Sequence, residues 1–404
     1  MLSENTINNL IEPIITRQEA INTYVISKIA KSVREVGSIS KEDIKRMKIL
    51  IEQGTDIREM NKELAKQSNL QVRDIKSMIK EVAKQTHIDA KPLYDYRHKR
   101  FIPYQKNIKL QRLVSVIGKR TASTYANISN SRATGFLIRD LKNPSSLKFQ
   151  SIGDTYKTVL DEAIQASQSG VIDYRTAMRR TLKQLSDSGI RRLSWDSGYT
   201  QRLDTAVRRN LLEGIRAINQ GIEDTIGEEI GADGKELSAH NNCAEDHEPF
   251  QGHIFTNEQY NNLQTHQNFT DIEGQVFDGV ERTIGLWNCR HVARSIIIGV
   301  TKPRYTAEQL QKFIDDNHTG YTLPNGTHLT MYECTQMQRK METRIRYAKD
   351  EQIILRESGD IQGAKLARQK VINLTQEYIK FSKSCGLPVE EDRMSVAGYK
   401  AIKI

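Results

Sequence analysis

Residues 7–29 read INNLIEPIITRQEAINTYVISKI, and the apolar side chains in this stretch follow a helical pattern. They recur at spacings of three, four and seven residues, which places them on one face of an α-helix: Ile7, Leu10, Ile11, Ile14, Ile15, Ile21, Val25 and Ile29. The pattern predicts a long amphipathic helix over residues 1–36. Because one face of such a helix has to be covered, we expect the chain to begin with a helical bundle.

Further helices are predicted after this one. Ser40-Lys41-Glu42-Asp43 resembles a capping box, and Gly54 ends the helix that it starts. Pro92 and Pro103 make residues 88–105 an ordered connector rather than the interior of a helix. The helices expected up to residue 220 cover residues 40–54, 56–67, 71–86, 107–127, 152–168, 173–188 and 196–219, with Gly170, Gly189 and Gly221 as stops for the last three.

The composition changes near residue 221, where glycines and short β-compatible patches replace the helical pattern. Strands are expected after Gly234, around His253-Ile254-Phe255 and over residues 296–300. Residues 221–304 are therefore predicted to form a compact, loop-rich α+β module.

Helical patterns return after residue 304. Thr306 with Gln309 and Thr330 with Glu333 are spaced as capping boxes, which predicts helices over residues 306–317 and 330–357. On the next helix, which Gly386 ends, the apolar residues step by three and four: Ala364, Ala367, Val371, Leu374, Tyr378 and Phe381. The last two helices are expected to form an antiparallel hairpin, used for self-packing or for contact with another subunit.

The predicted fold class is mostly α with a small α+β module. Its parts are an N-terminal helical region (1–90), a basic helical region (91–220), the His/Cys-containing α+β module (221–304) and a C-terminal helical hairpin (305–404). A length of 404 residues is compatible with two to three domains. No apolar run is long enough to span a membrane, and the first residues do not resemble a signal peptide, so we expect no membrane association. The four cysteines (Cys243, Cys289, Cys334 and Cys385) are then expected to be reduced thiols or ligands in a cytoplasm.

Charge is distributed unevenly along the chain. The net charge is +10, but residues 91–142 alone carry +10 and residues 221–285 carry −12. The basic block is interleaved with aromatic residues, a combination that could bind a phosphate backbone and stack on bases. Two alternatives are a solvated helix face whose aromatic side chains turn to the core, and a surface for acidic protein partners. The candidate DNA-binding residues are Arg97, Lys99, Arg100, Lys106, Lys109, Arg112, Lys119 and Arg120.

The acidic module contains imidazole and thiol groups in two clusters, His240-x-x-Cys243-x-x-x-His247 and Cys289-Arg290-His291. Zinc prefers about four such donors, and a small loop-rich module gains folding free energy from binding it. The candidate ligands of a structural zinc ion are His240, His247, Cys289 and His291. The spacing fits no standard zinc finger, and the alternative is that these side chains form buried hydrogen bonds in a small core.

Catalysis has less support in the sequence. Cys289 with His240 or His247 could form a thiolate–imidazole pair, as in a hydrolase or nuclease, but no oxyanion-hole signature accompanies it. Walker A, Gly-x-Gly-x-x-Gly and Gly-x-Ser-x-Gly motifs are absent from the sequence.

Several motifs together resemble one family. Leu237-Ser238-Ala239-His240, the segment from His247 to Gly252, and Trp287-Asn288-Cys289-Arg290-His291 are similar to motifs of the minor capsid protein family 2 of tailed bacteriophages. That family is distantly related to the Mu-F-like head morphogenesis proteins. The resemblance continues over residues 202–209, 305–310, 332–346, 384–387 and 393–399, whereas residues 242–245, Phe250 and residues 282–286 depart from the family pattern. The motif core is formed by Ser238, Gln251, Gly252, Trp287, Asn288 and Arg290.

The resemblance implies a low-copy virion protein without enzymatic activity, associated with the portal vertex or the head interior. Its implied partners are the portal protein, other head proteins and packaged DNA. It would be made in the host cytoplasm and end in the phage head. The alternatives are a DNA-binding virion protein delivered with the genome, and a Cys/His-dependent hydrolase or nuclease.

Overall fold

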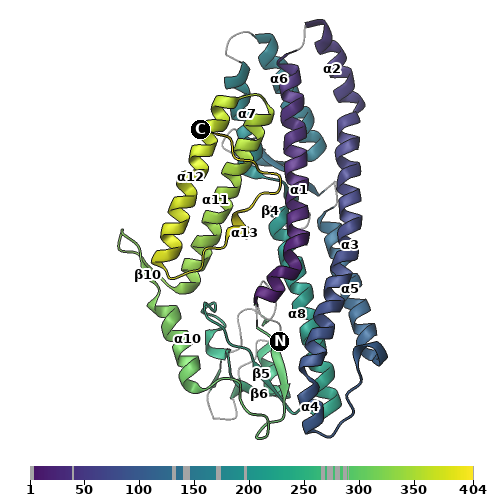
Figure 1. The fold of residues 1–404 in the computed structure, drawn as a ribbon, viewed down its shortest axis with the longest axis vertical. Coiled ribbons are helices and arrows are strands. Elements are labelled where there is room, and N and C mark those ends of the chain that lie inside the picture. The colour runs from purple at the N-terminus through teal and green to yellow at the C-terminus, as the bar shows by residue number, and fades with distance from the viewer. Residues whose placement is uncertain are drawn as a thin grey trace. The chain divides into compact units, whose positions relative to one another are not determined.

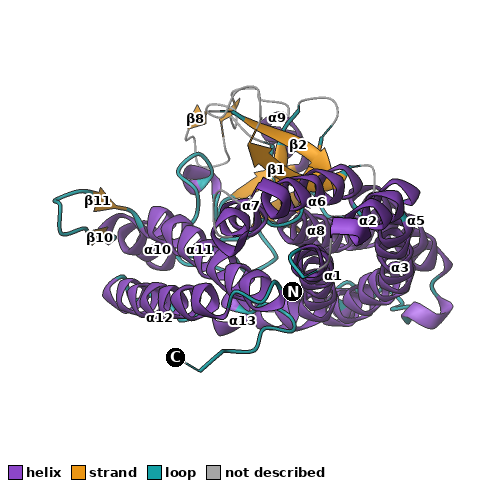
Figure 2. Ribbon diagram, turned by 90° about the horizontal axis from the view of Figure 1, so that it is seen from above, coloured by secondary structure: helices purple, strands orange, loops and turns teal. Residues whose placement is uncertain are grey.

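The computed structural model describes most of the chain. The described residues are 4–38, 41–129, 133–139, 146–169, 174–194, 198–264, 269–270, 276–277, 283–284, 289 and 291–403. They are mostly helical, with small antiparallel sheets (Figures 1 and 2), which confirms the predicted fold class. Among these residues, no helix is both long and apolar enough to cross a membrane.

The chain is divided into two compact units. Unit 1 contains Met1–Ile11, Arg73–Ser123 and Arg209–Met337, and unit 2 contains Glu12–Val72, Thr124–Arg208 and Gln338–Ile404. Each unit takes chain from several of the four segments expected from the sequence. The division of the sequence into these four segments therefore stays a prediction.

The first helices follow the apolar periodicity of the sequence. They are α1 (Glu4–Val36), α2 (Lys41–Gln53), α3 (Thr55–Asp89), α4 (Lys91–Tyr96) and α5 (Ile108–Ile128), with a 3₁₀ turn at Tyr104–Lys106. The long helix expected over residues 1–36 is confirmed. The prediction of two helices over 56–67 and 71–86 is wrong, because the segment between them has no glycine or proline to interrupt the hydrogen bonding of α3.

Three helices form the middle of the chain: α6 (Ile152–Ser169), α7 (Tyr174–Ser188) and α8 (Leu203–Ile230). The stop predicted at Gly221 is wrong. Ile222, Ile226 and Ile230 continue the apolar period of α8 and are all buried, so packing maintains the helix through the glycine. It ends before Gly231, which has a φ of +69°.

A four-stranded antiparallel sheet in unit 2 was not predicted. Its order is β2-β1-β3-β4, and its strands are β1 (Thr134–Arg139), β2 (Leu147–Ser151), β3 (Arg191–Leu193) and β4 (Thr200–Arg202). Helices α6 and α7 pack against β1 (Figure 2), where Phe136 is fully buried. Strands as short as β3 and β4 carry too few residues to show an alternating pattern.

The α+β module of unit 1 contains a three-stranded antiparallel sheet in the order β6-β5-β9. Its elements are β5 (Gly234–Leu237), a 3₁₀ turn (Glu248–Phe250), β6 (Ile254–Thr256), α9 (Asn257–Gln264) and β9 (Ala293–Ile296), with β7 (Phe269–Thr270) and β8 (Val276–Phe277) paired separately. The expected strands near Gly234 and Ile254 are confirmed, whereas the strand expected over residues 296–300 occurs earlier, as β9.

The C-terminal part contains α10 (Ala307–Thr319), β10 (Tyr321–Thr322), β11 (His328–Leu329), α11 (Met331–Glu357), α12 (Ile361–Ser384) and α13 (Glu391–Met394). The two capping boxes predicted for this part form: Gln309 and Glu333 receive hydrogen bonds from the backbones of Thr306 and Thr330. The capping box predicted at Ser40 lies outside the described residues. The pair α11–α12 follows the predicted pattern, with Ala364, Ala367, Val371 and Tyr378 buried and Leu374 and Phe381 partly buried.

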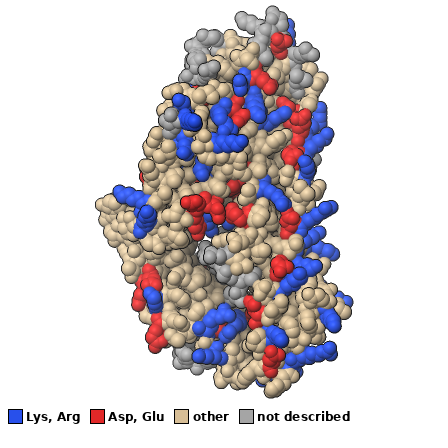
Figure 3. All heavy atoms as spheres, in the orientation of Figure 1, with Lys and Arg blue, Asp and Glu red and all other residues tan. Residues whose placement is uncertain are grey.

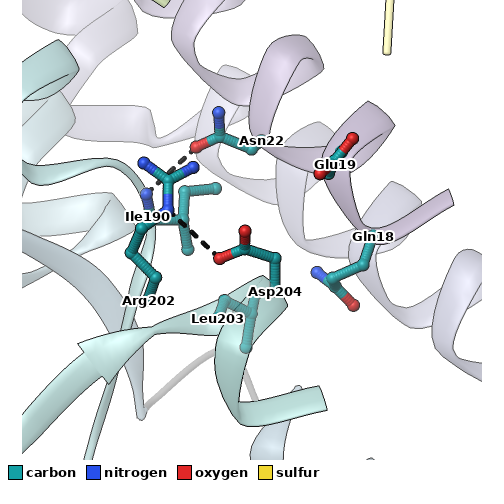
Figure 4. Close-up of a pocket in the computed structure, with 7 residues that line it drawn as sticks. All are labelled: Gln18, Glu19, Asn22, Ile190, Arg202, Leu203 and Asp204. Atoms are coloured by element: carbon teal, nitrogen blue, oxygen red, sulfur yellow. Dashed lines mark hydrogen bonds and ion pairs between the residues drawn. The ribbon is translucent and has the colours of Figure 1, made fainter. Parts of the chain in front are cut away.

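Unit 2 contains a buried group of charges. Arg202 Nε donates to Asp204 Oδ1 at 3.1 Å, and a second nitrogen of the guanidinium lies 3.7 Å from Asp350 Oδ2. Arg346 pairs with Asp204, and it lies 3.8 Å from Glu19 Oε1. Figure 4 shows Arg202 and Asp204 pointing toward each other, beside Glu19 on α1.

This group holds three carboxylates and two guanidinium groups, so one carboxylate lacks a full counter-charge. Burial and the nearby charge of Asp204 raise the pKa of Glu19 to about 8, against the opposing effect of Arg346 and Arg202. Burial also raises the pKa of Asp350 to about 6. For Asp204, burial alone would raise the pKa, but Arg202 and Arg346 hold it well below its ordinary value. At neutral pH we therefore expect Glu19 to be protonated.

The folded protein should lose stability as the pH rises from about 4.5 to 8, because the folded state holds a proton on Glu19 that the unfolded chain releases. We expect Glu19→Gln to remove the part of this pH-dependent loss of stability that comes from Glu19. The variant should match the wild type near pH 5 and exceed its free energy of unfolding at pH 8.5 by about 4 kcal/mol, measured by urea unfolding. The exposed Glu213→Gln is the control, and it should change stability by less than about 0.5 kcal/mol at either pH. A Glu19→Gln protein that is less stable than wild type at pH 8.5 would show that Glu19 is ionised and stabilised by Arg346.

Gly252, which belongs to the motif core, has a φ of +77°. A Cβ atom there would overlap the side chain of Leu310 on α10. We expect Gly252→Ala to cost about 2–4 kcal/mol, because the strain of the left-handed backbone and the overlap add together. Gly326→Ala is the matched control: its φ is +86° but it has nothing within 4 Å of the new Cβ, so it should cost about 1 kcal/mol. Equal losses of stability in the two variants would show that Leu310 moves aside freely.

Candidate metal centre and basic face

The antiparallel sheet of unit 1 brings the two predicted donor clusters together. Leu237, at the end of β5, pairs with Ala293, at the start of β9. Since the strands run in opposite directions, the chain leaving β5 toward His240 lies beside the chain that enters β9 from His291. The sheet therefore places donors that are far apart in sequence at one end of the same pair of strands.

Three residues of the motif core maintain this strand end. The backbone N–H of Ser238 donates to Val292 O, and the Ser238 hydroxyl accepts from the N–H of Val292, both at 3.0 Å. Gln251 Oε1 accepts from the backbone N–H of His240 at 3.1 Å, and the N–H of Gly252 donates to Leu237 O at 3.1 Å. These three motif residues therefore hold in place the loop that follows β5 and the segment that precedes β9. Trp287, Asn288 and Arg290 lie outside the described residues.

A small apolar core supports the module. It contains Leu237, Phe250, Phe255, Leu263, Ile284 and Ala293, with Tyr260 and Cys289 packed against it. A core of this size gives limited hydrophobic stabilisation, so additional cross-links between its loops would matter.

Five His and Cys side chains gather beside this core as two triads that share His291. One triad is His240, Cys243 and His291, and the other is His247, Cys289 and His291; within each, one donor atom per residue lies within 4.8 Å of the others. His291 is central: its Nε2 is 3.7 Å from Cys243 Sγ and its Nδ1 is 3.2 Å from Cys289 Sγ. Its ring stacks on His240 and lies edge-on to His247.

The environment of this cluster favours neutral imidazole. Burial lowers the pKa of His291 well below its ordinary value, and neighbouring His240 and His247 lower it further. His247 and Cys243 are also buried, whereas His240 is partly exposed. A neutral imidazole carries a lone pair on one ring nitrogen, which is the form that binds metal ions.

All four ligands predicted from the sequence, His240, His247, Cys289 and His291, lie in this cluster. Cys243, which the sequence places in the same motif but outside the predicted set, joins them. The thiol–imidazole pair considered for catalysis involved Cys289 with His240 or His247, and an imidazole nitrogen of His291 also lies 3.2 Å from Cys289 Sγ.

The basic residues of the second candidate site lie in unit 1, on α5 and on the segment between α4 and α5. All eight side chains are exposed: Arg97, Lys99, Arg100, Lys106, Lys109, Arg112, Lys119 and Arg120. Figure 3 shows Lys and Arg side chains recurring along the edge that α3 and α5 occupy in Figure 1. Arg97 Nε donates to the carbonyl of Ile230, and Lys109 pairs with Glu228, so these two also bind the end of α8. We call the other six the basic face.

Of the aromatic residues interleaved with the basic block, Tyr94 and Tyr125 are buried, Phe101 and Tyr104 are partly buried and Tyr96 is exposed. Tyr94 is buried and donates to Glu229, while the ring of Phe101 stacks on His87. Tyr125 is fully buried in unit 2, and Tyr96 is the exposed member of the interleaved set, with 62% of its surface accessible. Tyr94 and Tyr125 therefore turn to the core, as one of the alternatives expects, whereas Tyr96 has a ring that is accessible for stacking.

Comparison with known proteins identifies the family. The family model described as phage minor capsid protein 2 matches residues 2–381. No curated protein and no solved structure matches the chain. The match extends over nearly the whole chain, including the first 150 residues, where the sequence motifs gave only general resemblance. The chain therefore belongs to the phage minor capsid protein 2 family, and it is a structural component of the phage virion.

Proposed function

We propose that this protein is a low-copy head component that joins the head during assembly at the portal vertex. Its partners in this proposal are the portal protein and other proteins of the head. The observation that carries the proposal is the extent of the family match, residues 2–381, which takes in both compact units. Because the match covers both units, the assembly role that we propose involves the whole chain rather than a single domain.

The role that we propose involves no catalytic turnover. A family that is named for its place in the capsid favours a structural function. The basic face supports recognition of an acidic surface, because exposed Lys and Arg side chains attract and orient a partner of opposite charge. An acidic patch on the portal or on a neighbouring head protein would provide this charge.

Quantitative mass spectrometry of purified virions and proheads tests the assembly role. We expect the protein in both particles, at far fewer copies than the major capsid protein, and we expect chemical cross-linking to link it to the portal protein. Its absence from both particles would contradict the proposal. Presence at a copy number close to that of the major capsid protein would contradict the placement at a single vertex.

A second candidate function is contact with packaged DNA, favoured by the exposure of the basic face. Phosphate contacts made by such side chains release counterions, so binding should weaken steeply with salt. This contact would let the protein associate with the genome within the head and leave with it.

Reversing four charges of the basic face tests this function: Lys99→Glu, Arg100→Glu, Lys106→Glu and Arg112→Glu. We leave Arg97 and Lys109 unchanged because they bind the end of α8. In a gel-shift assay with duplex DNA at about 50 mM salt, we expect at least a tenfold loss of affinity. The slope of log affinity against log salt should fall by about one for each phosphate contact removed.

The control carries the same change of charge at the other end of the chain: Lys380→Glu, Lys383→Glu, Lys400→Glu and Lys403→Glu, all at exposed positions. It should bind as the wild type does. If the wild type does not bind DNA at low salt, or if both variants lose affinity equally, the basic face is not a DNA site.

A further inference from the structure

The hydrogen bonds around the His/Cys cluster determine which ring nitrogens carry lone pairs. His240 Nδ1 lies 2.9 Å from the carbonyl oxygen of Asn241. A carbonyl oxygen only accepts, so Nδ1 must carry the hydrogen. In the neutral ring of His240 the lone pair is then on Nε2. A backbone carbonyl bound to the other nitrogen is the usual arrangement around a histidine that ligates a metal.

His291 is oriented in the same way by Cys289. The sulfur of Cys289 faces two nitrogens of His291, the ring Nδ1 at 3.2 Å and the backbone N–H at 3.4 Å. We assign the ring contact as a hydrogen bond donated by Nδ1–H to the sulfur, which is the tautomer that leaves the lone pair on Nε2. The lone pair of a neutral His291 is then on Nε2, which points toward Cys243.

The distance between His291 Nε2 and Cys243 Sγ fits a pair of zinc ligands. Zinc–sulfur and zinc–nitrogen bonds of about 2.3 and 2.05 Å at a tetrahedral angle place the two ligand atoms about 3.5 Å apart. The measured distance is 3.7 Å, which a small side-chain adjustment would close. Together with His240, these two residues form the triad whose donor atoms lie within 4.8 Å of one another.

We propose that one zinc ion binds to His240 Nε2, Cys243 Sγ and His291 Nε2, and that Cys289 positions the ring of His291 without binding the metal. Zinc suits two imidazoles and one thiolate better than magnesium or calcium, which prefer oxygen ligands. The fourth position is left to solvent, because His240 is the partly exposed side of the cluster. The thiol proton of Cys243 is released to water when the thiolate binds the metal.

The proposed ion would connect the two loops that flank the β5–β9 pair. His240 and Cys243 come from the loop that leaves β5, and His291 comes from the segment that enters β9. Metal binding free energy becomes folding free energy in such a module, since the unfolded chain has no preformed site. This inference does not depend on where the protein sits in the virion.

Elemental analysis of the full-length protein, loaded with Zn²⁺ and then dialysed, tests the ligand set. We expect about one zinc per chain in the wild type, and loss of the zinc in Cys243→Ser, His240→Ala and His291→Ala. Cys289→Ser should still bind zinc, with a Kd about 10–100-fold weaker, as expected for a residue that positions a ligand. His247→Ala should also bind zinc. Cys385→Ser, which changes a buried cysteine of unit 2, is the control and should keep a full equivalent.

Cobalt(II) substitution of the wild-type protein gives a readout that does not require any variant to fold. A sulfur-to-cobalt charge-transfer band with the intensity of one thiolate would support the proposed set. A band with the intensity of two thiolates would overturn it, by making Cys289 a ligand.

Two outcomes of the zinc measurement would also overturn the proposal. One is less than about 0.2 zinc per chain in the wild type after loading, since a zinc site of this kind binds tightly. The other is retention of zinc by Cys243→Ser and His240→Ala with loss in Cys289→Ser and His247→Ala, which would move the metal to the second triad.

Discussion

The buried pairing of Arg202 with Asp204 and Asp350 is the constraint on which unit 2 depends most. Arg202 ends β4, Asp204 lies in the first turn of α8 and Asp350 lies on α11, so one guanidinium group connects the junction of β4 and α8 to a helix that is far away in sequence. Asn22 extends the contact to α1, because it donates to Asp350 and accepts from the backbone of Ile190. Removing the cation would leave the buried Asp350 without its guanidinium partner and Asp204 with Arg346 alone, and breaking a buried pair in this way typically costs about 3–5 kcal/mol. The requirement for charge balance therefore fixes how these helices and strands meet.

Much of the helical fold could be predicted because its signals are local. The capping boxes at Thr306 and Thr330 need partners only three residues away, and the apolar pattern of α12 is visible in its own sequence. The continuation of α3 was missed although no glycine or proline interrupts it, and the continuation of α8 was missed because buried side chains maintain that helix through Gly221. The sheet of unit 2 was missed because β3 and β4 have three residues each, too few to show an alternating pattern before β3 pairs with β1 and β4 pairs with β3.

The sequence could show which residues of the candidate metal centre are donors. It could not show how their donor atoms are arranged relative to one another. Sequence spacing identified His240, His247, Cys289 and His291, and the register of β5 against β9 brings them to one place. Spacing could not show that both ring nitrogens of His291 face sulfur atoms, nor that Cys243 lies on the side of the Nε2 lone pair. Similarly, the aromatic residues of the basic segment were recognisable, but their burial depends on partners such as Glu229 and His87 from other helices.

Arg97 and Lys109 both contact the end of α8. These contacts reduce the positive potential that the basic segment presents to a distant partner. These two cations lie at the negative end of a helix dipole and beside the carboxylate of Glu228, so their fields are largely cancelled at a distance. The remaining positive potential comes from side chains that are fully hydrated, and at physiological ionic strength it decays over about 8 Å. A partner would therefore be recognised on contact rather than attracted from afar. Such short-range recognition suits a protein that meets its partners at high local concentration, inside a growing particle.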